Sequence, residues 1–280
     1  MTLPTILLIH GAWHTPAHYS GYIAALQKKG LTVHAPHLPT CDPSFQGDGQ
    51  ASIHDDIAHV RTLATELVQR GEKVIVVMHS YGGAVGTDAV EGLGFPYHSP
   101  PSSSPSSAVP ADTGGVIHLL YLCAYILPPA TAVWDIVQQA GFDKVWDQYI
   151  HTSEEDGTIF PHDPAMMFFS GTPSTSIPES TVDFALSNLV RFPLSALKTP
   201  VSGSKKIWES VPVTYLSTKK RDYAVPGAYQ GIMLEGVENA GVGIEVLDVD
   251  SSHSVFVERE KEMVDVVLGI VEKDQEQRGV

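Results

Sequence analysis

Short apolar runs alternate with amphipathic stretches along most of this 280-residue chain. The apolar runs, several of them rich in valine and isoleucine, predict strands at residues 5–9, 31–36, 74–78, 116–122, 211–217 and 243–250. Helical spacing of apolar residues, or runs of small residues, predicts helices at residues 17–29, 53–70, 84–90 and 255–271. Strands joined by crossover helices predict an α/β fold with a mostly parallel, doubly wound sheet, whose site lies at the carboxyl ends of its strands.

Two segments interrupt this alternation. Residues 97–115 are rich in serine and proline and low in complexity, which predicts a flexible surface insertion without a core of its own. Residues 128–210 contain many aromatic side chains but no regular succession of strands and helices. We therefore expect a core domain made of residues 1–127 and 211–280, with residues 128–210 as a separate unit.

Ser80 follows the strand expected at residues 74–78 and precedes a run of small residues that begins at Gly82. A serine on a sharp strand-to-helix turn projects its hydroxyl from the sheet, with the free N–H groups of the new helix behind it. These dipoles stabilise negative charge, so the turn suits a nucleophile. The usual pattern is Gly-x-Ser-x-Gly, and because Met78 fills the first small position we expect a slightly displaced turn. An ordinary strand–helix connection is the alternative.

Other polar residues follow other predicted strands. Asp222 and His253 each come just past a strand, in the chain order serine, aspartate, histidine. Residues 10–13, with the sequence His-Gly-Ala-Trp, follow the first strand and can aim a backbone N–H at the nucleophile. A serine hydroxyl needs an imidazole to take its proton, and the imidazole needs a carboxylate to orient it. The order of these motifs therefore predicts a catalytic triad.

On these motifs the chain resembles the α/β-hydrolase superfamily and, within it, the plant methylesterase and hydroxynitrile lyase group. The resemblance spans nearly the whole chain. It implies that Ser80 is the nucleophile, His253 the general base and then the general acid, and Asp222 the carboxylate that orients His253. It also implies an oxyanion hole formed by the backbone N–H groups of Ala12 and Tyr81.

The resemblance identifies residues 128–210 as a helical cap, inserted before the strand that leads to the acid. The aromatic content of this cap predicts a pocket for a hydrophobic or aromatic small molecule. The candidate pocket residues are Trp13, His14, Trp134, Phe168 and Phe169. For each aromatic residue the alternative is burial in the cap's own core, and for His14 it is a surface position.

Asp222 has competitors for the role of the acid. It can pair with the basic residues at positions 219–221, which is the common fate of a surface carboxylate. Asp248 and Asp250 also precede His253, but both lie on the expected strand, where they compete poorly for the imidazole. We therefore expect Asp222 to be the partner of His253.

Two positions separate this chain from the lyases of the group. Those lyases carry a lysine directly after the catalytic histidine and a threonine in the oxyanion turn, where this chain has Ser254 and Gly11. Both differences favour an esterase, in which water or an alcohol completes the exchange. The serine at position 80 argues against dehalogenase and epoxide hydrolase chemistry, which use an aspartate in its place.

The composition limits the classes of partner and the location that we expect for this protein. With 17 basic and 32 acidic residues the formal net charge is −15, which argues against nucleic acid and anionic membranes. Cys41 and Cys123 are too few for a disulfide framework, and a buried thiol is expected at Cys123. No apolar run is long enough for a membrane helix, and the first strand begins too early to leave room for a signal peptide, so we expect a cytoplasmic location.

The 13 histidines show no paired spacing such as His-Glu-x-x-His, so we expect no metal and no other cofactor. We expect a structural role for His10, with its ring hydrogen-bonded beneath the oxyanion turn.

Together these features predict serine-dependent hydrolysis of a small to medium hydrophobic carboxylic ester or lactone through an acyl-serine. One alternative keeps the triad but uses it for carbon–carbon bond cleavage, acyl transfer or cyclisation on a polyketide-like metabolite. Another is a ligand receptor on a hydrolase scaffold that has lost turnover. The sequence does not indicate an oligomeric state.

Overall fold

The structure, a computed structural model, describes residues 3–47, 50–96, 113–170, 177–218 and 221–277. Its centre is a six-stranded parallel sheet in the order β2-β1-β3-β4-β8-β9. The strands are β1 (Thr5–Ile9), β2 (Thr32–His34), β3 (Lys73–His79), β4 (Gly115–Leu122), β8 (Val213–Ser217) and β9 (Glu245–Asp248). The order reverses between β1 and β3, and the crevice outside such a reversal is where open α/β sheets bind their ligands.

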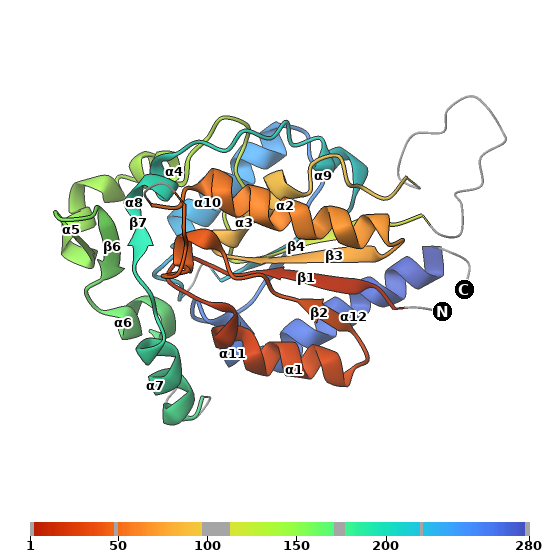
Figure 1. Cartoon of the computed structure of the whole chain (residues 1–280), viewed down its shortest axis with the longest axis horizontal. Coiled ribbons are helices and arrows are strands. Elements are labelled where there is room, and N and C mark those ends of the chain that lie inside the picture. Colours follow the sequence, from red (N-terminus) through yellow and green to blue (C-terminus); the bar gives the residue numbers. More distant parts are fainter. Residues whose placement is uncertain (1–2, 48–49, 97–112, 171–176, 219–220, 278–280) are drawn as a thin grey trace.

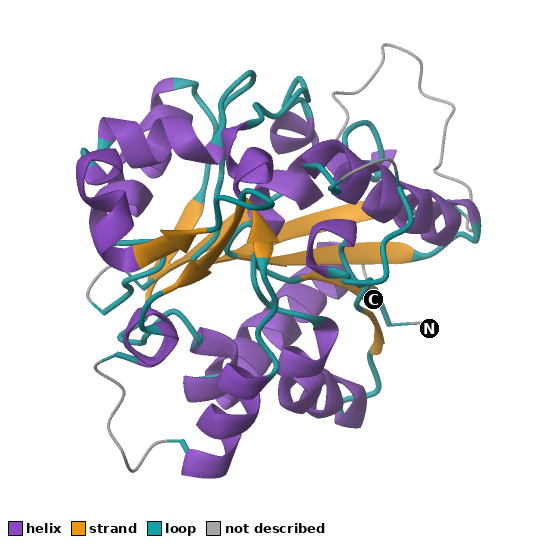
Figure 2. Cartoon of the chain, turned by 60° about the vertical axis from the view of Figure 1, so that its left-hand side comes forward, coloured by secondary structure: helices purple, strands orange, loops and turns teal. Residues whose placement is uncertain are grey.

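Helices cover both faces of this sheet (Figures 1 and 2). One face packs against α1 (Ser20–Lys28), α11 (Val255–Glu258) and α12 (Glu260–Gln277), and the other against α2 (Ile53–Gln69), α3 (Gly82–Ala89) and α10 (Gly227–Asn239). The predicted doubly wound α/β fold is therefore confirmed.

Strand periodicity explains the two layers. In β1, Ile6 and Leu8 belong to the hydrophobic cluster shared with α1 and α12, whereas Leu7 and Ile9 belong to the cluster shared with α2 and α3. Successive side chains of a strand point to opposite faces of the sheet, so a fully apolar strand is buried on both sides.

The segment between β4 and β8 forms a cap at the end of the sheet away from the chain termini (Figure 1). It contains the short helices α4 (Val133–Gln139), η4 (Phe142–Val145), α5 (Trp146–Tyr149), α6 (Pro164–Phe169), α7 (Glu179–Ser187), α8 (Leu194–Lys198) and α9 (Ile207–Ser210). It also contains a small antiparallel sheet of β5 (Ile150–Thr152), β6 (Thr158–Pro161) and β7 (Phe192–Pro193). The cap is thus only partly helical, because a turn with Gly157 in the left-handed region joins β5 to β6 as a hairpin.

Other boundaries differ in detail from the predictions. The first helix is preceded by a short 3-10 turn, η1 (Pro16–Tyr19), another such turn, η2 (Pro39–Cys41), follows β2, and the last helix is divided at Arg259. The helix α10 was not predicted. Residues 97–112 of the predicted insertion lie outside the described residues, and Gly115 begins β4 instead of belonging to the insertion. Within the described ranges, no helix is both long and apolar enough to cross a membrane.

Candidate active site

Ser80 occupies a strained turn between β3 and α3. Its φ of 54° lies in the left-handed region, which costs a residue other than glycine about 1–3 kcal/mol. Neighbouring strand ends hold this conformation: the Ser80 N–H donates to the carbonyl of Leu122 (3.2 Å), and the Tyr125 N–H donates to the carbonyl of Ser80 (2.9 Å). The serine hydroxyl is thereby presented at the carboxyl edge of the sheet, the geometry of a nucleophile elbow.

The bulky residue before this turn is accommodated by a glycine on the facing helix. Met78 is fully buried, and a Cβ atom built on Gly86 of α3 would lie 2.7 Å from its Sδ atom and 2.8 Å from its Cγ atom. No side chain other than hydrogen fits at position 86 without movement. The Met78 side chain therefore fits because Gly86, one turn after the start of α3, has no side chain.

Asp222 is a buried carboxylate that four donors surround. Its Oδ2 atom accepts from His253 Nδ1 (2.8 Å) and from the Thr218 hydroxyl (2.7 Å). Its Oδ1 atom accepts from the backbone N–H groups of Ala224 (2.9 Å) and Val225 (2.7 Å). Because a carboxylate accepts, Nδ1 of His253 carries the proton and Nε2 is left with its lone pair.

The competing acids are engaged elsewhere. Asp250 accepts from Nε of Arg221 (2.9 Å), and Glu258 accepts from Nη2 of the same guanidinium (2.7 Å). Asp248 ends the edge strand β9. The neighbours of Asp222 at positions 219 and 220 lie outside the described residues. The expected pairing of Asp222 with His253 is therefore present.

A buried chain of hydrogen bonds connects the backbone of His253 to the turn after β1. The Gly11 N–H donates to the Tyr19 hydroxyl (3.1 Å), which contacts His79 Nδ1 (2.7 Å), and His79 Nε2 contacts the His253 carbonyl (3.0 Å). Since a carbonyl can only accept, Nε2 of His79 donates, and Nδ1 receives the Tyr19 proton. Burial lowers the pKa of His79 well below its usual value, which keeps the ring neutral.

His253 packs against the residue that precedes the nucleophile. Its ring centroid is 4.5 Å from that of His79, the residue directly before Ser80. Within the described part of the chain, the Ser80 hydroxyl and His253 Nε2 form no hydrogen bond with each other. In enzymes of this type the contact between nucleophile and base often tightens only when substrate is present.

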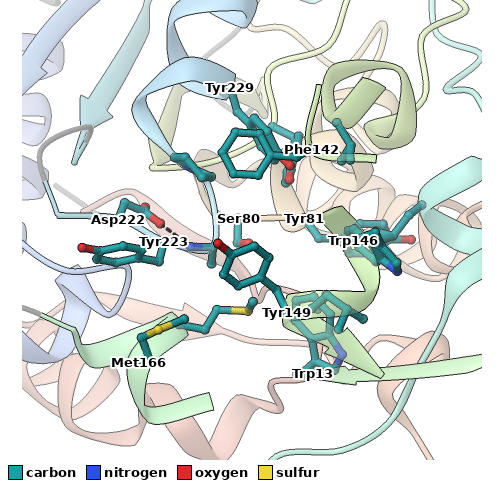
Figure 3. Close-up of a pocket in the computed structure, with 18 of the residues that line it drawn as sticks. Trp13, Ser80, Tyr81, Phe142, Trp146, Tyr149, Met166, Asp222, Tyr223 and Tyr229 are labelled. Carbon is teal, nitrogen blue, oxygen red and sulfur yellow. Dashed lines mark hydrogen bonds between the residues drawn. The ribbon is translucent and has the colours of Figure 1, made fainter. Parts of the chain in front are cut away.

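Two backbone N–H groups at the cavity are available for an oxyanion. Ala12 and Tyr81 both line the cavity, and neither N–H donates a hydrogen bond to any other described residue. Figure 3 shows Tyr81 beside Ser80. Tyr81 caps the N-terminus of α3, where free N–H groups and the helix dipole favour negative charge. Both N–H groups are therefore candidates for the predicted oxyanion hole.

The Tyr81 side chain is anchored to a buried carboxyl in α2. Asp56 accepts from the Tyr81 hydroxyl (2.9 Å), and from the N–H (2.9 Å) and hydroxyl (2.6 Å) of Thr40. Burial outweighs these hydrogen bonds and raises the pKa of Asp56 to about 7. No sequence pattern indicated this contact, because Asp56 and Tyr81 lie on separate elements.

The cavity above Ser80 has a volume of about 510 Å³ and lies between the sheet edge and the cap (Figure 3). Figure 3 shows Tyr229 and Phe142 on one side of Ser80, with Trp13 and Met166 on the other. The wall is mainly apolar and aromatic, and is made by Ala12, Trp13, Ser80, Tyr81, Tyr125, Val137, Phe142, Trp146, Tyr149, Ile150, Met166, Met167, Leu197, Arg221, Asp222, Tyr223, Ala224, Pro226, Gly227 and Tyr229. A cavity of this size and character accepts a small to medium hydrophobic molecule.

Of the five predicted pocket residues, Trp13 lines this cavity and the others lie behind its wall. His14 is buried, with its Nδ1 atom 2.8 Å from the Ala12 carbonyl oxygen. Phe168 packs edge-on against His14 (4.9 Å), and Trp134 packs against Trp146 (4.9 Å). Phe169 is also buried in the hydrophobic core. For Phe168 and Phe169, burial was the correct alternative. Trp134 is half-buried against the core, and His14 is buried, so it takes neither the predicted pocket position nor the surface position given as its alternative.

His10 is a structural residue, as expected. Its Nδ1 atom lies 2.9 Å from the Gly11 carbonyl oxygen, and its Nε2 atom accepts from the N–H of Leu38 (3.0 Å). Burial lowers the pKa of His10 to about 3, so the ring is neutral and braces the turn after β1.

In the part of the chain that the structure describes, one group of side chains has metal-ligand spacing: the ligand atoms of His79, Cys123 and His253 all lie within 4.8 Å of one another. All but one of their ligand atoms, Nε2 of His253, already have partners. Both nitrogens of His79 are hydrogen-bonded, Nδ1 of His253 binds Asp222, and the buried Cys123 thiol donates to the His253 carbonyl (3.5 Å). The group therefore forms part of the hydrogen-bonded support beneath the site.

A parallel sheet with a serine on a strained turn, and an aspartate–histidine pair at the same edge, defines the class of α/β hydrolases. A family model described as "Alpha/beta hydrolase family" matches residues 6–266. The chain therefore belongs to the α/β hydrolase family, and the resemblance seen in the sequence is confirmed.

Individual relatives agree with this assignment. The chain is 25% identical over 233 residues to "Alpha/beta hydrolase nvfD" of Aspergillus novofumigatus, which covers 82% of each chain. It is 36% identical over 85 residues to the pyrethroid hydrolase of Sphingobium wenxiniae, which covers 30% of this chain and 29% of the relative.

Solved structures share the fold. The pyrethroid hydrolase from Sphingobium faniae superposes with a TM-score of 0.69 at 20% identity, covering 98% of this chain and 100% of the other. Tomato methylketone synthase I in complex with 2-tridecanone superposes with a TM-score of 0.68 at 17% identity, covering 98% and 99%.

Proposed function

We propose that this protein hydrolyses a small to medium hydrophobic carboxylic ester or lactone through an acyl-serine intermediate on Ser80. The observation that carries the proposal is the 2.8 Å contact between His253 Nδ1 and Asp222 Oδ2, beside a serine with a φ of 54°. This combination provides an oriented base and a serine that lines the cavity. Ser254 and Gly11, which distinguish the chain from lyases of the resembled group, add support.

In the first half-reaction the Ser80 oxygen attacks the ester carbonyl carbon while Nε2 of His253 takes the hydroxyl proton. The carbonyl electron pair moves onto oxygen, where the N–H groups of Ala12 and Tyr81 stabilise the negative charge. Asp222 stabilises the imidazolium that forms. When the tetrahedral intermediate collapses, the bond to the alcohol oxygen breaks, and His253 returns its proton to the departing alcohol.

In the second half-reaction a water molecule attacks the acyl-serine. His253 takes one water proton, the oxyanion forms again at the same N–H groups, and the bond to the Ser80 oxygen breaks. The proton then returns to Ser80, and the carboxylic acid product leaves. Atoms and charge balance with one water consumed per ester, and the steps involve only side chains, backbone amides and water.

The wall of the 510 Å³ cavity supports a hydrophobic substrate, because nearly all of its side chains are apolar or aromatic. Such a wall binds the acyl or alcohol part by removing apolar surface from water, at about 25 cal/mol per Å². The cavity volume of about 510 Å³ lies in the range of sites that bind drug-sized molecules.

A panel of para-nitrophenyl esters with acyl chains of increasing length tests this proposal, with Ser80→Ala as the control variant. We expect release of nitrophenolate by the native enzyme at roughly five to six orders of magnitude above the variant for the best ester. Equal release by both proteins across the whole panel would contradict ester hydrolysis. It would favour carbon–carbon bond cleavage or acyl transfer by the same triad.

A further inference from the structure

Two buried tyrosines in the wall of the cavity, Tyr125 and Tyr229, have hydroxyls with no hydrogen-bond partner among the described residues. Tyr125 and Tyr229 are 7% and 5% exposed, and both line the cavity. Their ring centroids are 6.5 Å apart, so the two side chains are neighbours. Neither phenol oxygen makes a hydrogen bond within the described ranges of the chain.

The backbone holds both rings beside the nucleophile. Tyr125 follows the end of β4, and its N–H is bonded to the carbonyl of Ser80 (2.9 Å). Tyr229 lies in the first turn of α10, and the ring of Phe142 packs edge-on against it at 5.3 Å. In Figure 3, Tyr229 and Phe142 form one wall of the pocket above Ser80.

Several other polar groups of the wall are already engaged. The Tyr81 hydroxyl donates to Asp56, and the Arg221 guanidinium binds Asp250 and Glu258. Asp222 is saturated by its donors. The Trp146 indole N–H also has no partner, but it can only donate, and Tyr149 and Tyr223 are 41% and 54% exposed and reach solvent. Among the described residues of the wall, Tyr125 and Tyr229 are thus the buried tyrosines whose hydroxyls have unused hydrogen-bonding capacity.

Burial raises the pKa of both tyrosines, so both remain neutral phenols that can donate and accept hydrogen bonds. A buried polar group that finds no partner is costly, so a ligand that leaves both hydroxyls unpaired is penalised. A ligand with an oxygen atom at this position avoids the penalty. Sites of this kind discriminate strongly against analogues that lack the oxygen.

We propose, on the basis of the ester hydrolysis proposed above, that Tyr125 and Tyr229 form a specificity subsite for an oxygen substituent of the substrate. The preferred substrate is an aromatic or cyclic ester that carries a hydroxyl or keto oxygen away from the scissile carbonyl. Plain alkyl and aryl esters fill the same cavity but leave the phenol pair unpaired.

Matched methyl esters test the subsite: phenylacetate against para-hydroxyphenylacetate, and phenylpropanoate against para-hydroxyphenylpropanoate. The readout is the ratio of kcat/KM for the hydroxylated ester over the plain ester. We expect at least one pair to show a ratio of about ten or more, which corresponds to about 1.4 kcal/mol. Tyr125→Phe and Tyr229→Phe should each reduce this ratio several-fold.

Tyr215→Phe is the matched control, because Tyr215 is buried with an unpartnered hydroxyl but does not contribute to the cavity wall. Its ratio should equal that of the native enzyme. Ratios near one for both pairs of esters, or ratios unchanged in both cavity variants, would overturn the subsite.

A binding measurement separates this inference from the proposed reaction. Calorimetric titration of Ser80→Ala protein with the same esters reports affinity without turnover. If native protein hydrolyses none of the esters, the proposed function fails, while affinities still decide the subsite. About tenfold tighter binding of a hydroxylated ester, lost in Ser80→Ala/Tyr229→Phe, supports the subsite, and equal affinities overturn it.

Discussion

The Nδ1 atom of His253 lies 2.8 Å from Oδ2 of Asp222, and both side chains are buried. The two residues come from loops after different strands, β9 and β8, which are neighbours in the sheet. Asp222 also accepts from Thr218 and from two backbone N–H groups, so these three hydrogen bonds hold its carboxylate in position independently of His253. The carboxylate therefore selects the imidazole tautomer that leaves Nε2 available to the nucleophile.

This pairing predicts the effect of Asp222→Asn. The amide has nearly the same shape but can donate to Nδ1, which favours the wrong tautomer of His253. We expect kcat for the best ester to fall by about four orders of magnitude, as is typical when a triad acid is lost. Asp250→Asn is the control, because Asp250 pairs with Arg221 and its side chain is 63% exposed. Steady-state kinetics check both, and a larger loss in the control would assign the acid to Asp250.

The close packing of Gly11 against the nucleophile predicts the effect of Gly11→Ala. The new Cβ atom would lie 2.8 Å from Ser80 Cβ and 3.3 Å from its Oγ atom, so the serine must shift. We expect a loss of about 100-fold in kcat in a folded protein, because small displacements of reacting groups are costly. Gly231→Ala is the control, since nothing lies within 4 Å of its new Cβ atom. Equal kcat values for the two variants would contradict this prediction, because they would show that the turn containing Gly11 accepts the methyl group without displacing Ser80.

The contact between Met78 and Gly86 predicts a coupling that unfolding experiments can measure. Gly86→Ala inserts a methyl group 2.7 Å from Met78 Sδ, and overpacking of this kind destabilises a core by about 1–3 kcal/mol. Met78→Ala frees that space. The double variant should therefore be more stable than the sum of the two single changes by at least about 1 kcal/mol in urea unfolding. Additive changes in the free energy of unfolding would mean that α3 moves away from Met78 without strain.

The buried carboxyl of Asp56 predicts a pH dependence of stability. Its pKa rises from 3.8 to about 7 in the folded protein, so the folded state holds this proton where the unfolded state has released it. Between 3.8 and about 7, the contribution of Asp56 to the free energy of unfolding falls as pH rises, by at most about 1.4 kcal/mol per pH unit. The contribution is fully present below this window and lost above it.

Asp56→Asn removes this titration. The free energy of unfolding of the native protein, minus that of the variant, should decrease through the window and stay level above it. Urea unfolding at a series of pH values measures this difference, and a constant difference would contradict a raised pKa.

Much of the fold could be predicted because the apolar periodicity of a strand or a helix is contained within a short stretch of sequence. The helix at residues 53–70 was predicted almost to its end, since it has a capping serine, an apolar stripe and a closing glycine. The helix α10 was not, because Gly227, Gly231 and Gly236 dilute its helical pattern. The cap hairpin was missed because its strands are only a few residues long.

The candidate site was predicted in part for the same reason. Chain order and strand ends indicated Ser80, Asp222 and His253, since these positions depend on topology. Which side chains line the cavity depends on how each short cap helix is rotated about its axis. A helix of a few residues has too few apolar positions for the sequence to predict that rotation. Met166 and Met167 therefore line the cavity, whereas Phe168 and Phe169 in the same helix face elsewhere. Tyr125 and Tyr229 gave no local signal, because only packing brings them together.

The central claim is that Ser80 is an activated nucleophile, and covalent labelling tests it most directly. Native protein is incubated with a fluorophosphonate, and intact-mass and peptide measurements locate the adduct, with Ser80→Ala as the control. The account predicts one phosphonyl group on the peptide that contains Ser80, and none on the variant. Folded native protein that stays unlabelled, or that is labelled at another residue to the same extent in both proteins, would contradict it.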